Sequence, residues 1–167
     1  MAVAEQGRDA PEPDDAATGS DAPPGDAQGT DAPTADSGPR IGPSTPGPHT
    51  TTTTTDTLMR AGRSIPVVAY VPDRDAAPLV VFFPGFQLGS ERYGALCEHV
   101  ASHGFLVVRA DPPASFSNAD HVAMRDDAVA VIDWAIETFS PPPGVGAMGH
   151  SLGGKVSTML AGIDSRV

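Results

Sequence analysis

The chain has 167 residues, enough for one domain of moderate size, and its 21 acidic and 10 basic side chains give a net charge of −11. This acidic balance removes any electrostatic case for binding nucleic acid. No apolar run approaches the roughly twenty residues of a membrane-spanning helix, and the single cysteine, Cys97, excludes an internal disulfide.

Residues 1–56 are predicted to be a disordered acidic tail rich in Pro, Ala, Asp and Thr. Residues 1–48 hold nine acidic and two basic side chains, nine of the 18 prolines and no aromatic residue. Such a segment buries too little apolar surface to offset the chain entropy lost on folding. Recurring Asp-Ala pairs and the threonine run Thr50–Thr55 indicate low complexity and no repeat architecture. The folded domain is therefore expected over residues 57–167.

The sequence leaves the compartment and the oligomeric state open. The residues after Met1 lack the apolar segment of a signal peptide. A Pro- and Thr-rich stretch beside a folded domain is nevertheless common in exported and cell-envelope proteins. The protein therefore either stays inside the cell or has a true start upstream of Met1.

Four segments are predicted to be strands. Residues 64–71 are rich in β-branched residues, and Pro66 places them at a sheet edge because proline has no N–H to donate. Residues 79–83 and 105–108 are continuous apolar runs, which are typical of strands covered on both faces. Residues 145–148 are predicted to form a further short apolar strand.

Helices are predicted to connect these strands. Ser90 is expected to cap the first, which ends at Gly104 and has an apolar face of Tyr93, Leu96, Cys97 and Val100. Asn118 is expected to cap the second, with Asp120 in its first turn. The apolar stripe of this second helix would comprise Val122, Val129, Ile132, Ile136 and Phe139. Alternating strands and helices predict an α/β fold with a mostly parallel sheet and right-handed crossovers.

The last strand leads into Gly149-His150-Ser151-Leu152-Gly153, and a helix follows from about Leu152 to Ala161. A serine hydroxyl becomes a nucleophile when a sharp strand-to-helix turn holds it near a base and near amide donors. Gly149 and Gly153 leave the room that this turn requires. Ligands of parallel sheets bind beyond the carboxyl ends of the strands, where Ser151 would lie. The pattern thus predicts a nucleophile elbow with Ser151 as the catalytic nucleophile.

Three stretches together resemble the central part of an α/β-hydrolase: residues 81–86, residues 101–108 and residues 149–155. The resemblance is to the chlorophyllase, acetylhydrolase and polyester-hydrolase (dienelactone-hydrolase-like) group, and the Gly-Gly-Lys ending of the third stretch is nearest to chlorophyllase-like members. It covers residues 79–167, a little over half of the chain, and corresponds to the N-terminal portion of such a domain.

This resemblance implies a serine hydrolase that cleaves carboxylic esters through an acyl-serine intermediate. The backbone N–H groups of Leu152 and Phe86 would form the oxyanion hole, and the Phe86 ring would line the acyl pocket or, alternatively, cover the core. The implied substrate is a small-molecule or lipid-like ester. Neither a metal nor an organic cofactor is required, because a general base activates the serine.

The triad acid and base that the resemblance implies are missing. Only sixteen residues follow Ser151, and they include Asp164, expected to be a turn or capping residue, but no histidine. His150 is expected to point away from Ser151, and the remaining histidines are not convincing bases: His49, His99, His103 and His121. The chain is therefore predicted to be an incomplete hydrolase domain, inactive or weakly active alone and prone to aggregate at an unpaired edge beside the elbow strand.

Two other functions remain as alternatives. The chain could be a non-catalytic binding protein with an α/β-hydrolase-like fold, since fold does not fix function. It could also bind a nucleotide, because Gly149-x4-Gly154-Lys155 nearly matches a phosphate-binding loop. That loop needs a hydroxyl after its lysine, where this sequence has Val156, and Lys155 is expected to lie on the surface.

Overall fold

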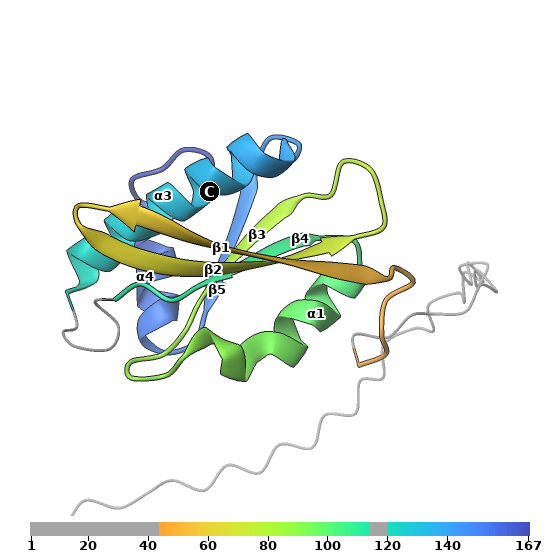
Figure 1. Cartoon of the computed structure of the whole chain (residues 1–167), viewed down its shortest axis with the longest axis horizontal. Helices are drawn as coiled ribbons and strands as arrows, with labels where there is room; N and C mark the ends of the chain where they lie inside the picture. The colour runs from red at the N-terminus through yellow and green to blue at the C-terminus, as the bar shows by residue number, and fades with distance from the viewer. Residues whose placement is uncertain (1–43, 114–119) are drawn as a thin grey trace, which may run out of the picture. The chain divides into compact units, whose positions relative to one another are not determined.

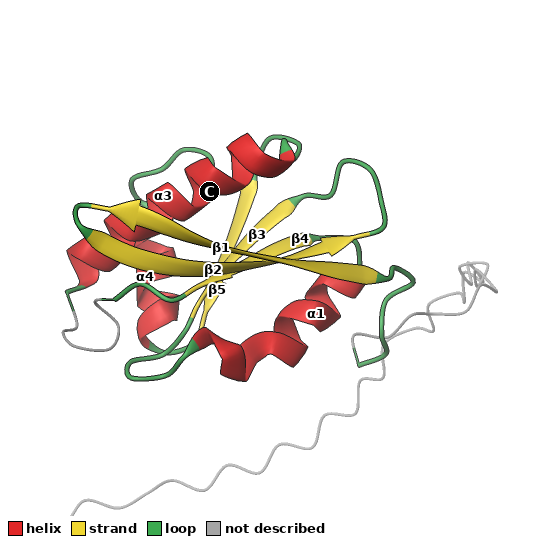
Figure 2. Ribbon diagram, viewed as in Figure 1, coloured by secondary structure: helices red, strands yellow, loops and turns green. Residues whose placement is uncertain are grey.

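The computed structural model describes residues 44–113 and 120–167, which form one mixed sheet with helices on both of its faces (Figure 1). Strands and helices alternate after an initial β-hairpin, as Figure 2 shows. The strands are β1 (Thr51–Arg60), β2 (Arg63–Pro72), β3 (Leu79–Phe83), β4 (Leu106–Ala110) and β5 (Val145–Gly149). The helices are the 3-10 helix η1 (Ser90–Tyr93) and the α-helices α1 (Gly94–Ser102), α3 (His121–Phe139) and α4 (Leu152–Ala161).

The strand order in the sheet is β1-β2-β4-β3-β5. Strands β4, β3 and β5 are parallel, with Val81 paired to Val108 on one side and to Ala147 on the other. The hairpin of β1 and β2 joins this parallel part through antiparallel pairing of β2 with β4. The predicted α/β class is confirmed, and the antiparallel hairpin makes the sheet mixed.

Strand β2 lies inside the sheet, so the prediction that Pro66 marks an edge strand is wrong. Pro66 faces Thr57 of β1, and its carbonyl oxygen accepts the N–H of Asp111 at 3.0 Å. The neighbour that covers β2 is β1, whose first residues the sequence analysis assigned to the tail. The start of the ordered chain is therefore earlier than residue 57; the rest of the predicted tail, residues 1–43, lies outside the described residues.

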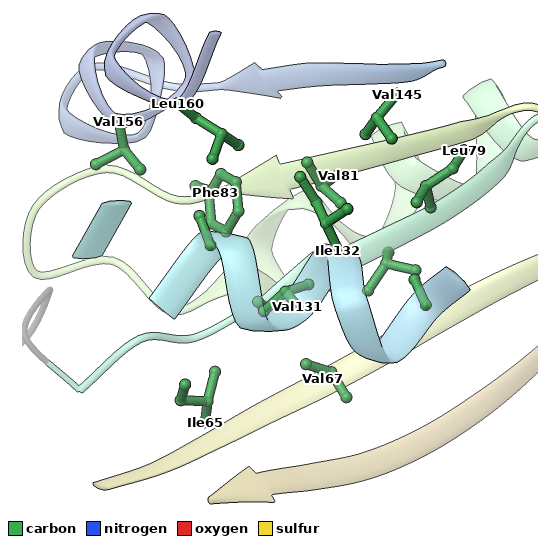
Figure 3. Packing of buried hydrophobic residues seen from close by; sticks show 14 of the residues in the cluster. Ile65, Val67, Leu79, Val81, Phe83, Val131, Ile132, Val145, Val156 and Leu160 are labelled. Atoms are coloured by element: carbon green, nitrogen blue, oxygen red, sulfur yellow. The ribbon is translucent and has the colours of Figure 1, made fainter. Parts of the chain in front are cut away.

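Apolar side chains fill the space on both faces of the sheet. One face packs against α3 and α4 and holds the larger cluster, in which Val81 and Phe83 of β3 meet Val131 of α3 and Leu160 of α4 (Figure 3). The other face packs against α1, and its smaller cluster consists of Tyr70, Phe82, Cys97, Ala101 and Val107. The continuous apolar run of β3 thus reflects its burial on both faces, as predicted.

Two features of α1 differ from the prediction. Ser90 does not cap α1; it begins η1, and Tyr93 occupies the N-cap position of α1. Leu96 is 45% exposed, because the buried side of the helix carries Cys97 and Ala101 instead.

Helix α3 also begins and packs differently from the prediction. Its cap is Asp120, which accepts the N–H of Ala123 at 3.0 Å, while Asn118 lies outside the described residues. Val122 is 52% exposed. The fully buried apolar residues of this helix share only Ile132 with the predicted stripe; they are Met124, Ala128, Val131, Ile132 and Ala135.

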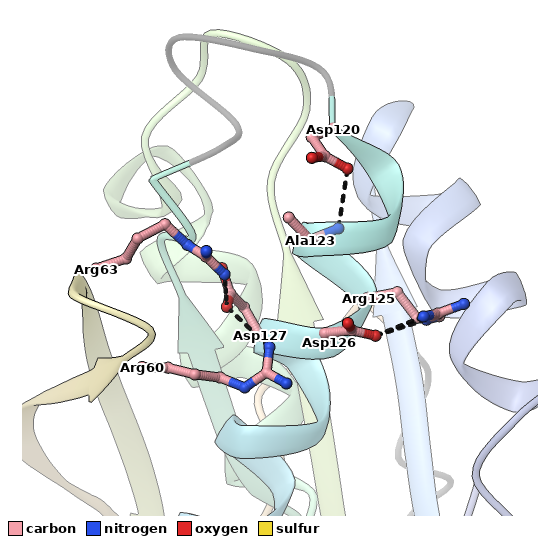
Figure 4. Close-up of polar contacts among 7 residues, drawn as sticks. All are labelled: Arg60, Arg63, Asp120, Ala123, Arg125, Asp126 and Asp127. Carbon is pink, nitrogen blue, oxygen red and sulfur yellow. Dashed lines mark hydrogen bonds and ion pairs between the residues drawn. The ribbon is translucent and has the colours of Figure 1, made fainter.

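A buried ion pair fastens the hairpin to α3. Asp127 is fully buried and accepts hydrogen bonds from Arg63 at 2.5 Å and from Arg60 at 3.3 Å (Figure 4). The bond to Asp127 raises the pKa of Arg63 above its usual value, so the Arg63 guanidinium stays charged at any ordinary pH. No helix within the described residues is long and apolar enough to cross a membrane.

Candidate active site

Ser151 lies at the sharp turn between β5 and α4, at the carboxyl end of the parallel strands. Its backbone angles are φ 50° and ψ −110°, which no regular element uses and which strain a residue with a Cβ. The residue is exposed, and its side chain does not cap the helix that follows. The hydroxyl is therefore presented to solvent and is not used to complete the helix.

The two glycines that flank Ser151 are packed against backbone. A Cβ atom on Gly149 would lie 2.7 Å from the carbonyl oxygen of Phe83, and a Cβ on Gly153 would collide with the same oxygen. Real Cβ atoms do not approach a backbone oxygen this closely, so only glycine lets β5 and α4 meet the end of β3 at this angle. The sharp turn thus depends on close packing of the backbones of β3, β5 and α4.

The loop after β3, Pro84–Gly89, begins against the elbow. The N–H of His150 donates to the Phe83 carbonyl oxygen at 3.2 Å, and Leu88 N–H donates to Gly85 O at 3.1 Å to close a turn. Gln87 adopts φ 57° within this turn. Phe86 is the other central residue of the turn, and its backbone N–H is one of the two proposed oxyanion donors.

The second proposed donor, the N–H of Leu152, belongs to the first residue of α4. The first N–H groups of a helix have no acceptor within the helix and carry a partial positive charge, which suits a developing oxyanion. The Leu152 side chain is only 8% exposed and packs in the core, so it holds this backbone in place. Phe86 is 44% exposed and belongs to neither core cluster, so it does not cover the core as the alternative interpretation expected.

His150 bridges the elbow and the segment after the Pro84–Gly89 loop. Its Nδ1 lies 2.8 Å from the hydroxyl oxygen of Tyr93, and the two rings are 5.9 Å apart. The imidazole also covers Gly85, where a Cβ would come within 2.8 Å of Nδ1. This arrangement engages His150 with Tyr93, as a neighbour of the elbow and not as a partner of the Ser151 hydroxyl.

A partly buried polar network that the sequence analysis missed lies at the end of the same loop. Ser90 is fully buried, and both its N–H and its hydroxyl donate to the carboxylate of Asp111, at 2.6 and 2.5 Å. Arg109 donates from Nη1 to the Ser90 hydroxyl oxygen at 2.5 Å and from Nε to the Tyr70 hydroxyl at 3.1 Å. The available signal was a pair of opposite charges, Arg109 and Asp111, flanking the end of a buried strand.

The five histidines all lie in the described part of the chain, and none of them hydrogen-bonds Ser151 there. Besides His150, His121 contacts Lys155 Nζ at 3.1 Å and His49 contacts Asp73 at 3.0 Å. His103 contacts the Thr45 carbonyl oxygen at 3.1 Å, and its ring lies edge-on to that of His99. No base for Ser151 is therefore assigned within residues 44–113 and 120–167.

Asp164 occupies the turn after α4, as predicted. Its carboxylate accepts hydrogen bonds from the backbone N–H and the guanidinium of Arg166, and the guanidinium holds the pKa of Asp164 below its usual value. Because Arg166 already occupies the Asp164 carboxylate, Asp164 is unsuited to orient a distant histidine.

Two further kinds of site find little support in the described ranges. No group of three or more His, Cys, Asp or Glu side chains is arranged there to hold a metal ion. Lys155 is exposed on α4, as predicted, whereas Val156 is fully buried in the core. The position where a phosphate-binding loop needs a magnesium-binding hydroxyl therefore faces away from any nucleotide.

Sequence comparison relates the chain to one family. The sequence model of that family, described as "Chlorophyllase", matches residues 45–164. Chlorophyllase-1 of Arabidopsis thaliana is 36% identical over 93 residues, which are 50% of this chain and 28% of that protein.

Comparison of folds finds esterases and other hydrolases. A cold-adapted esterase from an Arctic intertidal metagenomic library gives a TM-score of 0.59 at 18% identity, covering 69% of this chain and 57% of the esterase. A putative dienelactone hydrolase from Klebsiella pneumoniae gives 0.58 at 18% identity, covering 70% and 57%. The chain thus spans little over half the length of these structures, and identities this low show the fold alone.

Proposed function

The chain belongs to the chlorophyllase family of the α/β-hydrolase superfamily, and from this premise we propose that the protein hydrolyses carboxylic esters with Ser151 as its nucleophile. The observation that carries the proposal is the strained backbone of Ser151, at φ 50° and ψ −110°, on a strand-to-helix turn whose flanking residues must be glycine. Strain of about 1–3 kcal/mol at one residue persists where surrounding packing imposes it, and such residues concentrate at functional sites.

The chemistry follows from what the turn presents. The Ser151 hydroxyl would attack the ester carbonyl and form a covalent acyl-serine while the alcohol leaves. The N–H groups of Leu152 and Phe86 would hold the oxyanion of each tetrahedral intermediate, and loss of one such donor costs roughly 3 kcal/mol of barrier. Water then releases the acid. We propose that a histidine and a carboxylate from outside residues 44–113 and 120–167 supply the general base and its orienting acid.

The substrate is proposed to be a small-molecule or lipid-like ester. The exposed Phe86 ring beside the elbow offers an apolar contact for the acyl group. The loops that would select the alcohol group are not among the described residues, so chlorophyll-like, phospholipid-like and polyester substrates all fit this proposal.

The test is covalent labelling of the intact protein as encoded, including any sequence that precedes or follows these 167 residues. An alkyl fluorophosphonate probe is expected to label one peptide containing Ser151, and the Ser151→Ala variant is expected to lose both labelling and p-nitrophenyl ester hydrolysis. Ser157→Ala, which removes a hydroxyl that bonds Gly153 O within α4, is the control and should keep both.

A folded intact protein that neither reacts with the probe nor hydrolyses any activated ester would contradict the proposal and favour the non-catalytic binding protein. Activity that survives Ser151→Ala but disappears in Lys155→Ala, together with ATP binding, would instead favour the nucleotide-binding alternative.

A further inference from the structure

The polar network at Asp111 lies where the Pro84–Gly89 loop ends. Both oxygen atoms of the Asp111 carboxylate are used by Ser90, one by its N–H and one by its hydroxyl. Hydrogen bonds to an ionised acceptor are about twice as strong as neutral ones, and this pair is bidentate. Asp111 therefore fixes both the position and the orientation of the first residue of η1.

The sheet holds the Asp111 carboxylate itself in place. The Asp111 N–H donates to Pro66 O of β2, and the Arg109 guanidinium lies 3.9 Å from the carboxylate. Arg109 is in turn held by the Tyr70 hydroxyl, and its side chain is only 14% exposed. Both side chains are mostly shielded from solvent, and movement of either would break several of these hydrogen bonds at once, which favours one arrangement.

The loop between the two fixed points is six residues long. At its start, Phe83 O is bonded by the N–H of His150, next to Ser151. At its end, Ser90 is bonded by Asp111. The turn that contains Phe86 lies between them, so the direction of the Phe86 N–H depends on both anchors. A displacement of about 1 Å at a reacting centre can change a rate by about 100-fold.

We propose that Asp111 is a positioning residue for the oxyanion hole: acting through Ser90, it aims the Phe86 N–H at the oxyanion that forms above Ser151. This inference rests on the proposed esterase function. It assigns Asp111 no contact with substrate, and it requires that Asp111 affect the transition state more than it affects binding of the ester.

The matched control is Asp127, another carboxylate that arginine side chains hold. Asp127 is fully buried, and among the described residues its carboxylate bonds only Arg60 and Arg63. It acts on the opposite face of the sheet, between the hairpin and α3 (Figure 4). Loss of either carboxylate should destabilise the protein, but only loss of Asp111 should disturb the oxyanion hole.

The experiment compares Asp111→Ala, Asp111→Asn, Ser90→Ala and Asp127→Asn in the intact protein, assayed well below each melting temperature. Asp111→Ala is expected to lower kcat by about 10- to 100-fold with KM changed less than about threefold. The affinity for a trifluoromethyl ketone, whose tetrahedral adduct places an oxyanion in the same position, should fall by the same factor. Asp111→Asn, which keeps an acceptor for the Ser90 N–H, should recover part of kcat.

Ser90→Ala keeps the backbone bond and is expected to show a smaller loss of kcat, so the proposal is testable even if Asp111→Ala fails to fold. Asp127→Asn should lower the melting temperature and leave kcat, KM and trifluoromethyl ketone affinity unchanged. The proposal is overturned if the Asp111 and Ser90 variants behave like Asp127→Asn. A wild-type protein without esterase activity would instead overturn the proposed function, and this inference with it.

Discussion

The carbonyl oxygen of Phe83 limits which residue types fit on either side of the proposed nucleophile. It accepts the N–H of His150 and lies against both Gly149 and Gly153. Either glycine could be replaced without loss if only backbone freedom mattered, since neither has a positive φ. What requires glycine at both positions is the lack of space for a Cβ. Substitution is therefore expected to cost more stability at Gly153, where the Cβ would lie closer to the Phe83 oxygen than at Gly149.

Gly153→Ala is expected to lower both the free energy of unfolding and Ser151 labelling, because its Cβ would collide with the Phe83 carbonyl. Overpacking of this kind costs about 1–3 kcal/mol or more. Gly154→Ala is the control in the same helix; its Cβ would come no closer than 3.3 Å to Gly149 O, and alanine favours a helix by about 1 kcal/mol. Urea unfolding of both variants measures the difference, and equal stabilities would contradict this account.

Cys97 is predicted to be unreactive in the folded protein. Burial raises the pKa of its thiol from 9.0 to about 11, despite the opposing charge of Arg109. At pH 8 only on the order of 0.1% is then thiolate. A thiol reagent should react only after urea is added, and rapid reaction of the native chain would disprove this prediction. Because the unfolded thiol ionises near pH 9, the stability that its burial supports is lost as pH rises from about 9 to 11.

At the scale of elements, the N-terminus of α3 allows the contribution of a capping side chain to stability to be measured. Asp120→Ala removes the acceptor for Ala123 N–H and should cost about 1 kcal/mol. Asp126→Ala, in the same helix, removes only a partly exposed pair with Arg125 and should cost about 0–0.5 kcal/mol. Thermal unfolding of the two variants measures the contrast, and a larger loss for Asp126→Ala would show that Asp120 is not the effective cap.

The sequence analysis predicted the elements that form because their side chains are buried. It missed the features that depend on pairing with a distant segment of the same chain. Residues 79–83 and the elbow were predicted because β3 is apolar on both faces and the turn needs two glycines. The threonines of β1 carry no alternating apolar pattern, since most are exposed, and backbone pairing with β2 orders them. Likewise, Ser90 has the chemistry of an N-cap, but Asp111, 21 residues later, takes both of its hydrogen-bonding groups.

At the scale of the whole molecule, the sheet has an unpaired side along β5. Among the described residues β5 pairs with β3 alone, apart from one bond from Val145 N–H to Arg166 O. A hollow of about 490 Å³ runs beside it, with Met148, Ala161 and Val167 in its lining. Apolar surface and free backbone groups in one place invite pairing with another chain.

The 167-residue chain expressed alone is therefore predicted to self-associate and to show little esterase activity. Static light scattering should report oligomers, and Ala161→Lys, which adds a charge to the hollow, should increase the soluble monomer. Thr53→Lys, on exposed β1, is the control and should change nothing. A soluble wild-type monomer with a sharp, cooperative melt would contradict the prediction.

The Phe83 carbonyl has a consequence for motion as well as for shape. The elbow rests on this oxygen, and the chain segment bearing Phe86 departs from the same residue. When the sheet flexes, the Ser151 hydroxyl and the N–H groups of Leu152 and Phe86 move together, because all three are attached to the end of β3. The distances among them are therefore preserved, while their distances to other loops of the protein vary. A group that approaches Ser151 from elsewhere in the protein therefore meets a hydroxyl and two N–H groups in one fixed geometry.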